Sequence, residues 1–236
     1  MRINNYISAS GYCSRRKADE LILQKKVKIN GRVASIGDQV GEKDRVEVDG
    51  KRIGQKKKHV YIAFNKPEGV ICTTERHIKN NIIDFIGYEE RIFPIGRLDK
   101  DSEGLILLTS DGSIVNEVLR AENGHEKEYR VTLNHAFDAD FLEQMQSGVV
   151  IFNPVKKKHE KTLPCKIQKS DATTFSIILS QGLNRQIRRM SEALGYEVVK
   201  LKRVRFLNIK LGNLKLGHYR PLSDEEVKNL LNKKNK

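Results

Sequence analysis

One charged turn between two apolar segments limits most strongly how this chain can fold. The turn holds five side chains of both signs, which are Arg97, Asp99, Lys100, Asp101 and Glu103. Residues 105–108 then read Leu-Ile-Leu-Leu, and turn residues follow at 109–112. This pattern predicts a buried strand and, after it, a helix for which Asp111 is the N-cap. One acid of the turn is therefore expected on a short loop anchored to a core strand, where functional groups are often held.

Length and composition allow a sizeable core but no membrane span. With 236 residues, 38% of them hydrophobic, the chain suffices for one large or two smaller domains. Its apolar runs are too short to cross a bilayer, and the first residues do not resemble a signal peptide. Cys13, Cys72 and Cys165 lie far apart, which argues against a disulfide framework or a thiolate zinc site. We expect a cytoplasmic protein with no membrane partner and with reduced cysteines.

The charge balance favours a polyanionic partner. The chain has 44 basic and 30 acidic residues, a formal net charge of +14. Residues 1–58 alone hold 15 basic and 7 acidic residues, so the excess is densest at the N-terminus. A basic surface without a function is the alternative that charge by itself leaves open.

The first block of the chain reads as two short helices followed by a small sheet. Gly11 is expected to end the first helix, and Ser14 to cap the second. Apolar and charged residues then alternate up to two hairpin turns, Asn30-Gly31 and Asp49-Gly50. Arg15, Arg16 and Lys17 open the second helix, where cations oppose the helix dipole, so these residues are expected to face phosphate.

Residues 2–19 and 27–31 resemble the small RNA-binding domain named after ribosomal small-subunit protein four. The resemblance covers residues 1–53 and implies binding of structured RNA, with Arg2, Arg15, Arg16 and Lys17 as contacts. Lys25 departs from the pattern, since relatives often have glycine there. If its backbone is left-handed, the side chain costs about 1 kcal/mol.

Residues 54–59 read as an exposed linker, after which a second domain is expected over residues 60–230, with a frayed basic tail at 231–236. Lys66 ends the first strand of this domain, where it either contacts a phosphate or is simply solvated. Tyr129 lies in a strand over residues 125–133, and a lone tyrosine there more often packs than reacts. The basic stretch 155–159 is expected to be a solvated edge or a phosphate contact.

Three arginines gather on a helix that is predicted to start near Asn184. Arg185, Arg188 and Arg189 repel one another, so they require phosphates or a buried carboxylate beside them. The turn at Gly182 has the spacing of neither a Walker loop nor a dinucleotide fingerprint, and no His/Cys cluster supplies a metal site. We therefore expect no cofactor and no metal. Beyond this helix, residues 198–205 predict a strand in which basic side chains, Arg203 among them, are interleaved with apolar ones.

Five motifs occur in one order along the chain and together resemble the RsuA/RluB/RluE/RluF group of ribosomal RNA pseudouridine synthases. They are Asn65-Lys66-Pro67, residues 96–105, Glu126-Lys127-Glu128-Tyr129, residues 182–190 and Leu194-Gly195-Tyr196. Residues 38–40, 115–121 and 125–129 are similar to one member of the group for which a tRNA is a second substrate. The resemblance implies an α+β fold: the N-terminal RNA-binding module, then a catalytic domain with a mixed, mostly antiparallel sheet and surrounding helices.

The same resemblance implies a role for each matching residue. Asp99 corresponds to the aspartate that attacks the uridine, either at carbon 6 of the base or at the anomeric carbon, to form a covalent intermediate. Arg188 corresponds to the arginine that ion-pairs with this aspartate and keeps it charged. Tyr129 corresponds to the residue that stacks on the base, Leu201 to an apolar residue on its other side, and Arg97 to a residue that fills the space left by the flipped base.

The expected activity is thus the isomerisation of one uridine of large-subunit (23S) ribosomal RNA, with a tRNA uridine as a second substrate, by a monomeric enzyme. Lys66 and Arg185 are further candidates for contacts to the substrate. Two alternatives stay open at this point: the same chemistry on small-subunit (16S) ribosomal RNA, or a non-catalytic RNA-binding factor of ribosome assembly. The second would have no need of a paired carboxylate in a basic cleft.

Overall fold

The computed structural model describes the chain except residues 55–57, 116–117, 119–124 and 232–236. The chain forms two compact units, which are described separately. The first comprises residues 1–60, 88–92 and 109–112, and the second comprises the rest. The helix expected after Asp111, the family-like segment 115–121 and the predicted linker and tail lie wholly or partly outside the described residues.

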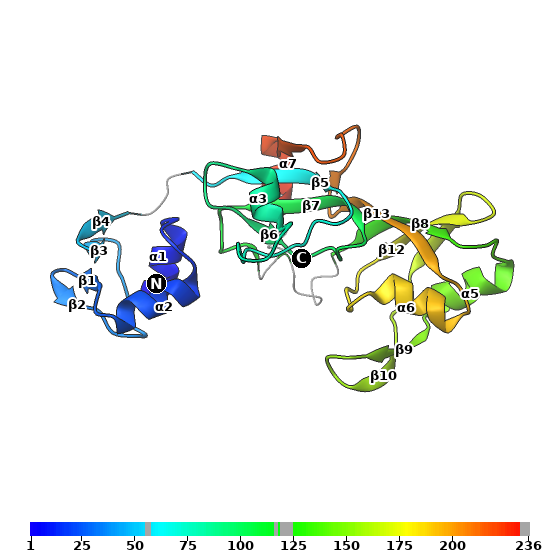
Figure 1. Cartoon of the computed structure of the whole chain (residues 1–236), viewed down its shortest axis with the longest axis horizontal. Helices are drawn as coiled ribbons and strands as arrows, with labels where there is room; N and C mark the ends of the chain where they lie inside the picture. The colour runs from blue at the N-terminus through cyan, green and yellow to red at the C-terminus, as the bar shows by residue number, and fades with distance from the viewer. Residues whose placement is uncertain (55–57, 116–117, 119–124, 232–236) are drawn as a thin grey trace. The chain divides into compact units, whose positions relative to one another are not determined.

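The N-terminal unit packs two helices on a four-stranded sheet (Figure 1). Its elements are α1 (Ile3–Ala9), α2 (Arg15–Leu23), β1 (Val27–Ile29), β2 (Arg32–Val33), β3 (Val46–Val48) and β4 (Lys51–Ile53), with the strand order β2-β1-β3-β4. Ser14 caps α2 by accepting a hydrogen bond from the Lys17 amide at 3.1 Å, as the sequence predicts. Buried residues of α1, α2, β1 and β3 form one apolar core.

The turns of this unit have the backbone that their residues favour. Asn30 and Gly31 both have positive φ, and so do Asp49 and Gly50, which confirms the two predicted hairpins. Lys25 has a φ of 58°, so the side chain does stand in a left-handed position that costs about 1 kcal/mol.

The second unit is built on a nine-stranded sheet with the order β11-β12-β8-β13-β7-β5-β15, to which β14 and β6 add at β13 and β7. The strands are β5 (Tyr61–Lys66), β6 (Phe93–Ile95), β7 (Glu103–Thr109), β8 (Lys127–Leu133), β11 (Lys166–Lys169), β12 (Thr174–Leu179), β13 (Val198–Phe206), β14 (Ile209–Lys210) and β15 (Tyr219–Pro221). The β7–β13 pair is parallel, whereas β8, for example, runs antiparallel to both of its neighbours. The mixed, mostly antiparallel sheet is therefore confirmed.

The described helices of this unit are α3 (Ile82–Ile86), α5 (Ala139–Ser147), α6 (Gln186–Ala193) and α7 (Asp224–Leu231). Two apolar clusters fill the space between helices and sheet. One joins α5 and α6 to β8, β12 and the first half of β13, and the other joins β7, the end of β13 and α7. None of the described helices has the length and apolar character needed to cross a bilayer.

Gly104 allows β7 and β13 to approach each other closely. Its φ is +105°, and a Cβ atom at this position would lie 2.3 Å from the carbonyl oxygen of Arg203 and 2.7 Å from its nitrogen. No side chain fits at such distances, so a glycine is required here. This contact fixes the start of β7, and with it the charged loop before β7, against the middle of β13.

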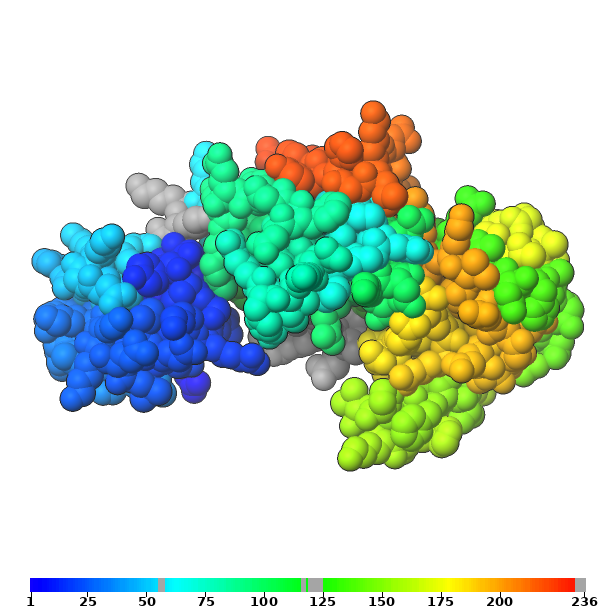
Figure 2. Space-filling model, in the orientation of Figure 1, coloured from blue at the N-terminus to red at the C-terminus, as the bar shows by residue number. Residues whose placement is uncertain are grey.

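The basic stretch 155–159 belongs to a hairpin that protrudes from the second unit (Figures 1 and 2). Its strands, β9 (Val150–Asn153) and β10 (Lys158–Lys161), form a two-stranded sheet of their own. Arg189 of α6 donates to the carbonyl of Phe152 at 2.7 Å and so ties the hairpin to the helix. Most of its lysines are exposed, as expected for a solvated edge.

Candidate active site

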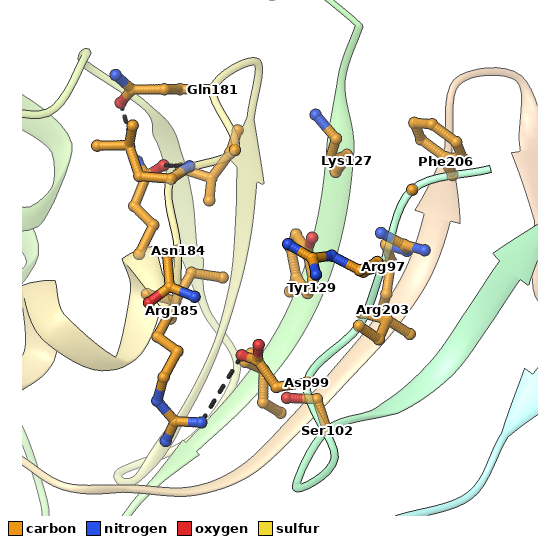
Figure 3. A pocket seen from close by; sticks show the side chains of 18 of the residues that line it. Arg97, Asp99, Ser102, Lys127, Tyr129, Gln181, Asn184, Arg185, Arg203 and Phe206 are labelled. Carbon is orange, nitrogen blue, oxygen red and sulfur yellow. Dashed lines mark hydrogen bonds and ion pairs between the residues drawn. The ribbon is translucent and has the colours of Figure 1, made fainter. Parts of the chain in front are cut away.

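A cavity of about 410 Å³ opens beside the charged loop (Figure 3). Separate parts of the chain line it: the loop over residues 95–102, strand β8, the segment 179–187 and strand β13, with Val155 from the hairpin. Leu201 belongs to one apolar core and Phe206 to the other, so the floor of the cavity lies where the two cores meet. A volume of this size is typical of a small-molecule or nucleotide site.

Asp99 lies on the loop that enters β7. The Ser102 amide donates to its carbonyl at 3.2 Å, and the neighbouring Leu98 amide donates to the Sγ of Cys72 at 3.4 Å, which closes and anchors the turn. The Asp99 side chain is 33% exposed and lines the cavity, where it is the only acid among the described lining residues. A carboxylate is thus presented to whatever enters, as the sequence predicts for one acid of this turn.

Arg185 is the cation that faces Asp99. Its Nη1 lies 3.9 Å from Oδ2 of Asp99 (Figure 3). The same guanidinium makes a two-pronged contact with Asp101, at 3.0 and 2.9 Å, which holds the pKa of Asp101 below its usual range. Arg185 has φ 50° and ψ 34°, a left-handed conformation before the first turn of α6. Helix α6 therefore begins at Gln186, two residues later than predicted, and the strained residue points its side chain at the loop.

Arg188 does not form the ion pair with Asp99 that the family resemblance implies. Its Nε lies 3.4 Å from a carboxylate oxygen of Asp101, and its Nη2 donates to the carbonyl of Asp101 at 2.7 Å. Nη1 donates to the carbonyl of Val198 at 2.8 Å. These contacts hold the Arg188 guanidinium between β13 and the loop backbone. The side chain is only 13% exposed, and it cannot turn toward Asp99 without breaking these contacts. Arg188 thus braces the loop two residues beyond the acid.

Lys66 has neither of the two positions that the sequence suggested. It is not solvated, and it is not placed to contact a phosphate. It is fully buried at the end of β5, and its Nζ donates to the carbonyl of Pro67 at 2.9 Å and approaches that of Lys100 at 3.5 Å. Burial lowers the pKa of this amine. The side chain is buried because β5 lies inside the sheet. Through its hydrogen bonds Lys66 supports the backbone next to Asp99.

The other predicted residues of the site line the same cavity. Tyr129 on β8 is half-buried and packs against the larger apolar core, so the expected packing and a surface open to the cavity occur together. Leu201 on β13 is buried, and Arg97 is exposed on the loop. Asp99, Tyr129, Arg97 and Leu201, drawn from three parts of the sequence, therefore surround one space.

Sequence reasoning missed two cations of the cavity wall. Arg203, expected as one of several interleaved basic residues, is only 3% exposed, and Lys127 on β8 lies beside it. The pairing of β8 with β13 shifts register twice, between Val198 and Lys200 and again between Arg203 and Arg205. Neither shift lies between Leu201 and Arg203, so alternation from the buried Leu201 places Arg203 on the same face, and this signal could have predicted its burial.

The N-terminal candidates form a separate set on the first unit. Arg15, Arg16 and Lys17 occupy the first turn of α2 and are exposed, as is Arg2 before α1. Lys17 pairs with Glu20 at 2.7 Å. Arg15 and Arg16 have no ion-pair partner within the part of the chain that the structure describes, so their charges are open to a ligand.

The described residues contain no group of three or more His, Cys, Asp or Glu side chains arranged to hold a metal ion. The three cysteines are free thiols. The chemistry available in the cavity is therefore that of one carboxylate, several cations, amides, a tyrosine and apolar walls.

Comparison with known proteins gives a consistent result for both units. The RNA pseudouridylate synthase family matches residues 60–193, and the S4 domain family matches residues 1–46. The dual-specificity RNA pseudouridine synthase RluF of Salmonella typhi is 51% identical over 96% of this chain and 77% of its own length. The ribosomal large subunit pseudouridine synthase B of Bacillus subtilis is 34% identical over 97% and 95% of the two chains. A crystal structure of a pseudouridylate synthase superposes with a TM-score of 0.70 at 29% identity, covering 98% of this chain and all of the other.

Proposed function

The chain belongs to the RNA pseudouridylate synthase family, within the RsuA/RluB/RluE/RluF group, and we propose that it isomerises one uridine of 23S ribosomal RNA. Relatives at 50–51% identity are called dual-specificity enzymes, and the Bacillus subtilis relative is named for the large ribosomal subunit. These names support 23S RNA over 16S RNA as the target. They also support a second RNA substrate, for which a tRNA uridine is our proposal.

The observation that carries the proposed chemistry is the position of Asp99. It is the only acid among the described residues that line the cavity, and a guanidinium faces it at 3.9 Å. Asp99 attacks the uridine at carbon 6 or at the anomeric carbon and forms a covalent bond to it. The bond between C1′ and N1 breaks, the base turns, and a bond forms between C1′ and C5. The bond to Asp99 breaks, either at C1′ as the new bond forms or at carbon 6 afterwards, which frees the carboxylate, and the proton on C5 is replaced by one on N1. No redox change occurs, so the reaction requires no electron acceptor.

The surrounding residues position the base and the acid. Tyr129 stacks on the uracil from β8, and Leu201 packs on its other side. Arg97, exposed at the mouth, fills the gap that the flipped nucleotide leaves in its stack. Arg185 supplies the positive charge opposite Asp99, whereas Arg188 and Lys66 hold the loop backbone.

RNA is held outside the cavity by the N-terminal unit, through Arg2, Arg15, Arg16 and Lys17. Non-specific attraction by exposed cations and recognition of RNA shape suffice for this task. We assign the binding module to residues 1–53 and the catalytic domain to residues 60–230. The protein acts as a monomer in the cytoplasm, where ribosomal RNA is made.

The test of the chemistry is Asp99→Asn. The change is isosteric, so RNA affinity should stay within about twofold while the single-turnover rate falls by at least about a thousandfold, because an amide is not a nucleophile of this kind. Asp140→Asn, on the exposed side of α5, is the matched control and should leave both values unchanged. Full activity of Asp99→Asn would remove this residue from the mechanism.

The test of the target is a map of pseudouridines in RNA from cells with and without this protein. Loss of one pseudouridine in 23S RNA is the expected result, and its return on expression of the wild-type chain but not of Asp99→Asn ties the loss to catalysis. A lost site only in 16S RNA would overturn the proposed target. No lost site in any RNA would favour the non-catalytic assembly factor.

A further inference from the structure

A buried cation, Arg203, and a half-buried one, Lys127, line a part of the cavity that the proposed mechanism does not use. Lys127 lies two residues before Tyr129 on β8, and Arg203 is the register partner of Tyr129 on β13 (Figure 3). Both charged groups approach the ring of Phe206, with Arg203 Cζ at 5.1 Å and Lys127 Nζ at 5.9 Å from its centroid. The three side chains therefore make one positively charged corner of the cavity, which we call the cationic corner.

The cationic corner contains few hydrogen-bond acceptors. Arg203 Nε donates to the carbonyl of Leu105 at 2.6 Å, but its Nη2 is buried without a partner. Lys127 Nζ has a single long contact, at 3.4 Å, to the carbonyl of His125. Neither cation has an ion pair with an acid of the described segments. Arg203 thus carries one strong donor that is buried beside the cavity without a partner.

The neighbouring residues show that acids are present on the same strand but face away. Glu126 and Glu128 flank Lys127, and both pair with Arg205, at 3.0 and 2.9 Å. Alternation along β8 sends these carboxylates to one face of the sheet and Lys127 and Tyr129 to the other. The strand therefore neutralises one arginine of β13 and leaves the other without a counter-charge.

An uncompensated buried cation is unfavourable unless a ligand supplies the missing acceptor. Burial lowers the pKa of Lys127, and the nearby positive charge of Arg203 lowers it further. Electron-rich oxygen atoms in the cavity would reverse both effects. The cationic corner is thus built for a ligand that presents such oxygen at the floor, beside the residue expected to stack on the base.

We propose that Lys127 and Arg203 bind the carbonyl oxygens of the flipped uracil and stabilise the negative charge that develops on the ring. This inference rests on the proposed function. If Asp99 attacks carbon 6, the electrons of the C5–C6 double bond move to O4. If it attacks C1′, the electron pair of the broken C1′–N1 bond stays on the ring and spreads to O2 and O4. In both cases the negative charge leaves the ring once the C1′–C5 bond has formed and the bond to Asp99 has broken, and the proton on C5 is then replaced by one on N1.

A phosphate is a poorer occupant of this corner than a base. Arg203 is 3% exposed and its free Nη2 is enclosed, whereas the cations of the mouth, Arg97 and Arg185, are open to solvent. The phosphates of an RNA strand remain outside when a base enters a cavity, so they meet the mouth first. The floor receives the base, and charge developing on it is stabilised most strongly where water is excluded.

The experiment compares Lys127→Met with wild type on RNA that carries uridine or 5-fluorouridine at the target position. With uridine the single-turnover rate should fall by about a hundredfold, as for loss of one donor to a developing anion, while the dissociation constant of the RNA changes less than about twofold. Fluorine withdraws electrons and stabilises the ring charge itself. Lys127→Met should therefore slow the consumption of 5-fluorouridine by a factor several times smaller than the factor for uridine.

Two further variants separate charge from folding. Arg203→Met should show the same pattern, and Arg203→Lys should recover part of the rate because it keeps the charge. Lys166→Met, an exposed lysine on β11, is the control for net charge and should behave like wild type. A weaker RNA affinity with an unchanged rate at saturation would assign the corner to a phosphate, and equal losses on both RNAs would also overturn the inference. A wild-type protein that forms no pseudouridine would instead contradict the proposed function.

Discussion

Two sets of cations, one in each unit of this protein, have opposite roles. In the N-terminal unit, Arg15 and Arg16 stand exposed at the start of α2, without an ion-pair partner among the described residues. In the catalytic unit, Arg188 and Lys66 are buried or nearly so, and backbone carbonyls around the Asp99 loop accept their hydrogen bonds. One set is available to RNA phosphates, and the other is committed to the fold.

The difference shows what a net charge can and cannot reveal. The total of +14 correctly indicated a polyanionic partner, but it counts exposed and buried cations alike. An exposed cation binds phosphate with a strength that falls as salt rises, because bound counterions are released. A buried cation must be matched by internal acceptors and contributes to positioning instead. The following predictions separate these two classes.

The largest effect is expected for Gly104→Ala, which should destabilise the catalytic unit and leave the stability of the N-terminal unit unchanged. Its Cβ would lie 2.3 Å from the backbone of Arg203, so we expect a loss of about 4 kcal/mol or more in the free energy of unfolding of the catalytic unit. Gly195→Ala is the control, because Gly195 has a similar positive φ but no atom within 4 Å, and should cost about 1 kcal/mol. Denaturant unfolding followed by amide NMR signals of each unit measures both values. Equal losses of unfolding free energy in the two variants would show that β7 and β13 can move apart at little cost.

The next prediction compares a nearly buried arginine with an exposed one beside the same acid. Arg188→Met leaves the carbonyls of Val198 and Asp101 without donors, so we expect a loss of about 2 to 3 kcal/mol in stability and, through displacement of the loop, about a hundredfold in rate. Arg185→Met removes only an exposed pair, so stability should change by less than about 1 kcal/mol. Thermal unfolding and single-turnover assays of both variants test this order. The reverse order would show that the exposed contact of Arg185 with Asp101, and not Arg188, holds the loop.

For the exposed class, replacing both Arg15 and Arg16 by Gln should weaken RNA binding by roughly tenfold at moderate salt. The slope of log affinity against log salt should become shallower by about 1.5, since two phosphate contacts are lost. The rate at saturating RNA should not change, and stability should not fall, because these cations oppose the dipole of α2. An unchanged slope would place the RNA contacts elsewhere.

The smallest effect concerns pH. Because Arg185 lowers the pKa of Asp101, this carboxylate stabilises the folded state at pH values above its usual pKa of about 4. This stabilisation is lost as the pH falls from about 4 through the lowered pKa of Asp101. The difference in melting temperature between wild type and Asp101→Asn should therefore shrink as pH is lowered from 5 to 3. A constant difference would show that the pair adds nothing to stability, as many exposed pairs do.

The features that the sequence predicted best are local. The Ser14 cap, the two hairpin turns and the buried strand after the charged loop depend on residues within a few positions of one another, and all are found. The mixed sheet followed from the family resemblance, as did the set of Asp99, Tyr129, Leu201 and Arg97 that lines one cavity.

What could not be predicted depends on contacts between distant parts of the chain. The burial of Lys66 follows from the place of β5 inside the sheet, which no local pattern specifies. Arg185 faces Asp99 in place of Arg188 because its backbone is left-handed ahead of α6. An arginine in the sequence does not predict this conformation. Arg203 and Lys127 were missed as site residues because their place in the cavity depends on the pairing of β8 with β13, two strands far apart in the sequence.

The parallel contact of β7 with β13 has a consequence for the making of the protein. Leu105 and Arg203 are 98 positions apart, so a ribosome must add all the residues between them before the strand that supports the catalytic loop exists. The N-terminal unit, whose strands pair within the first 53 residues, can fold long before this. A nascent chain is therefore able to bind RNA while its reaction centre is still missing, and it can modify this RNA only after β13 has been made.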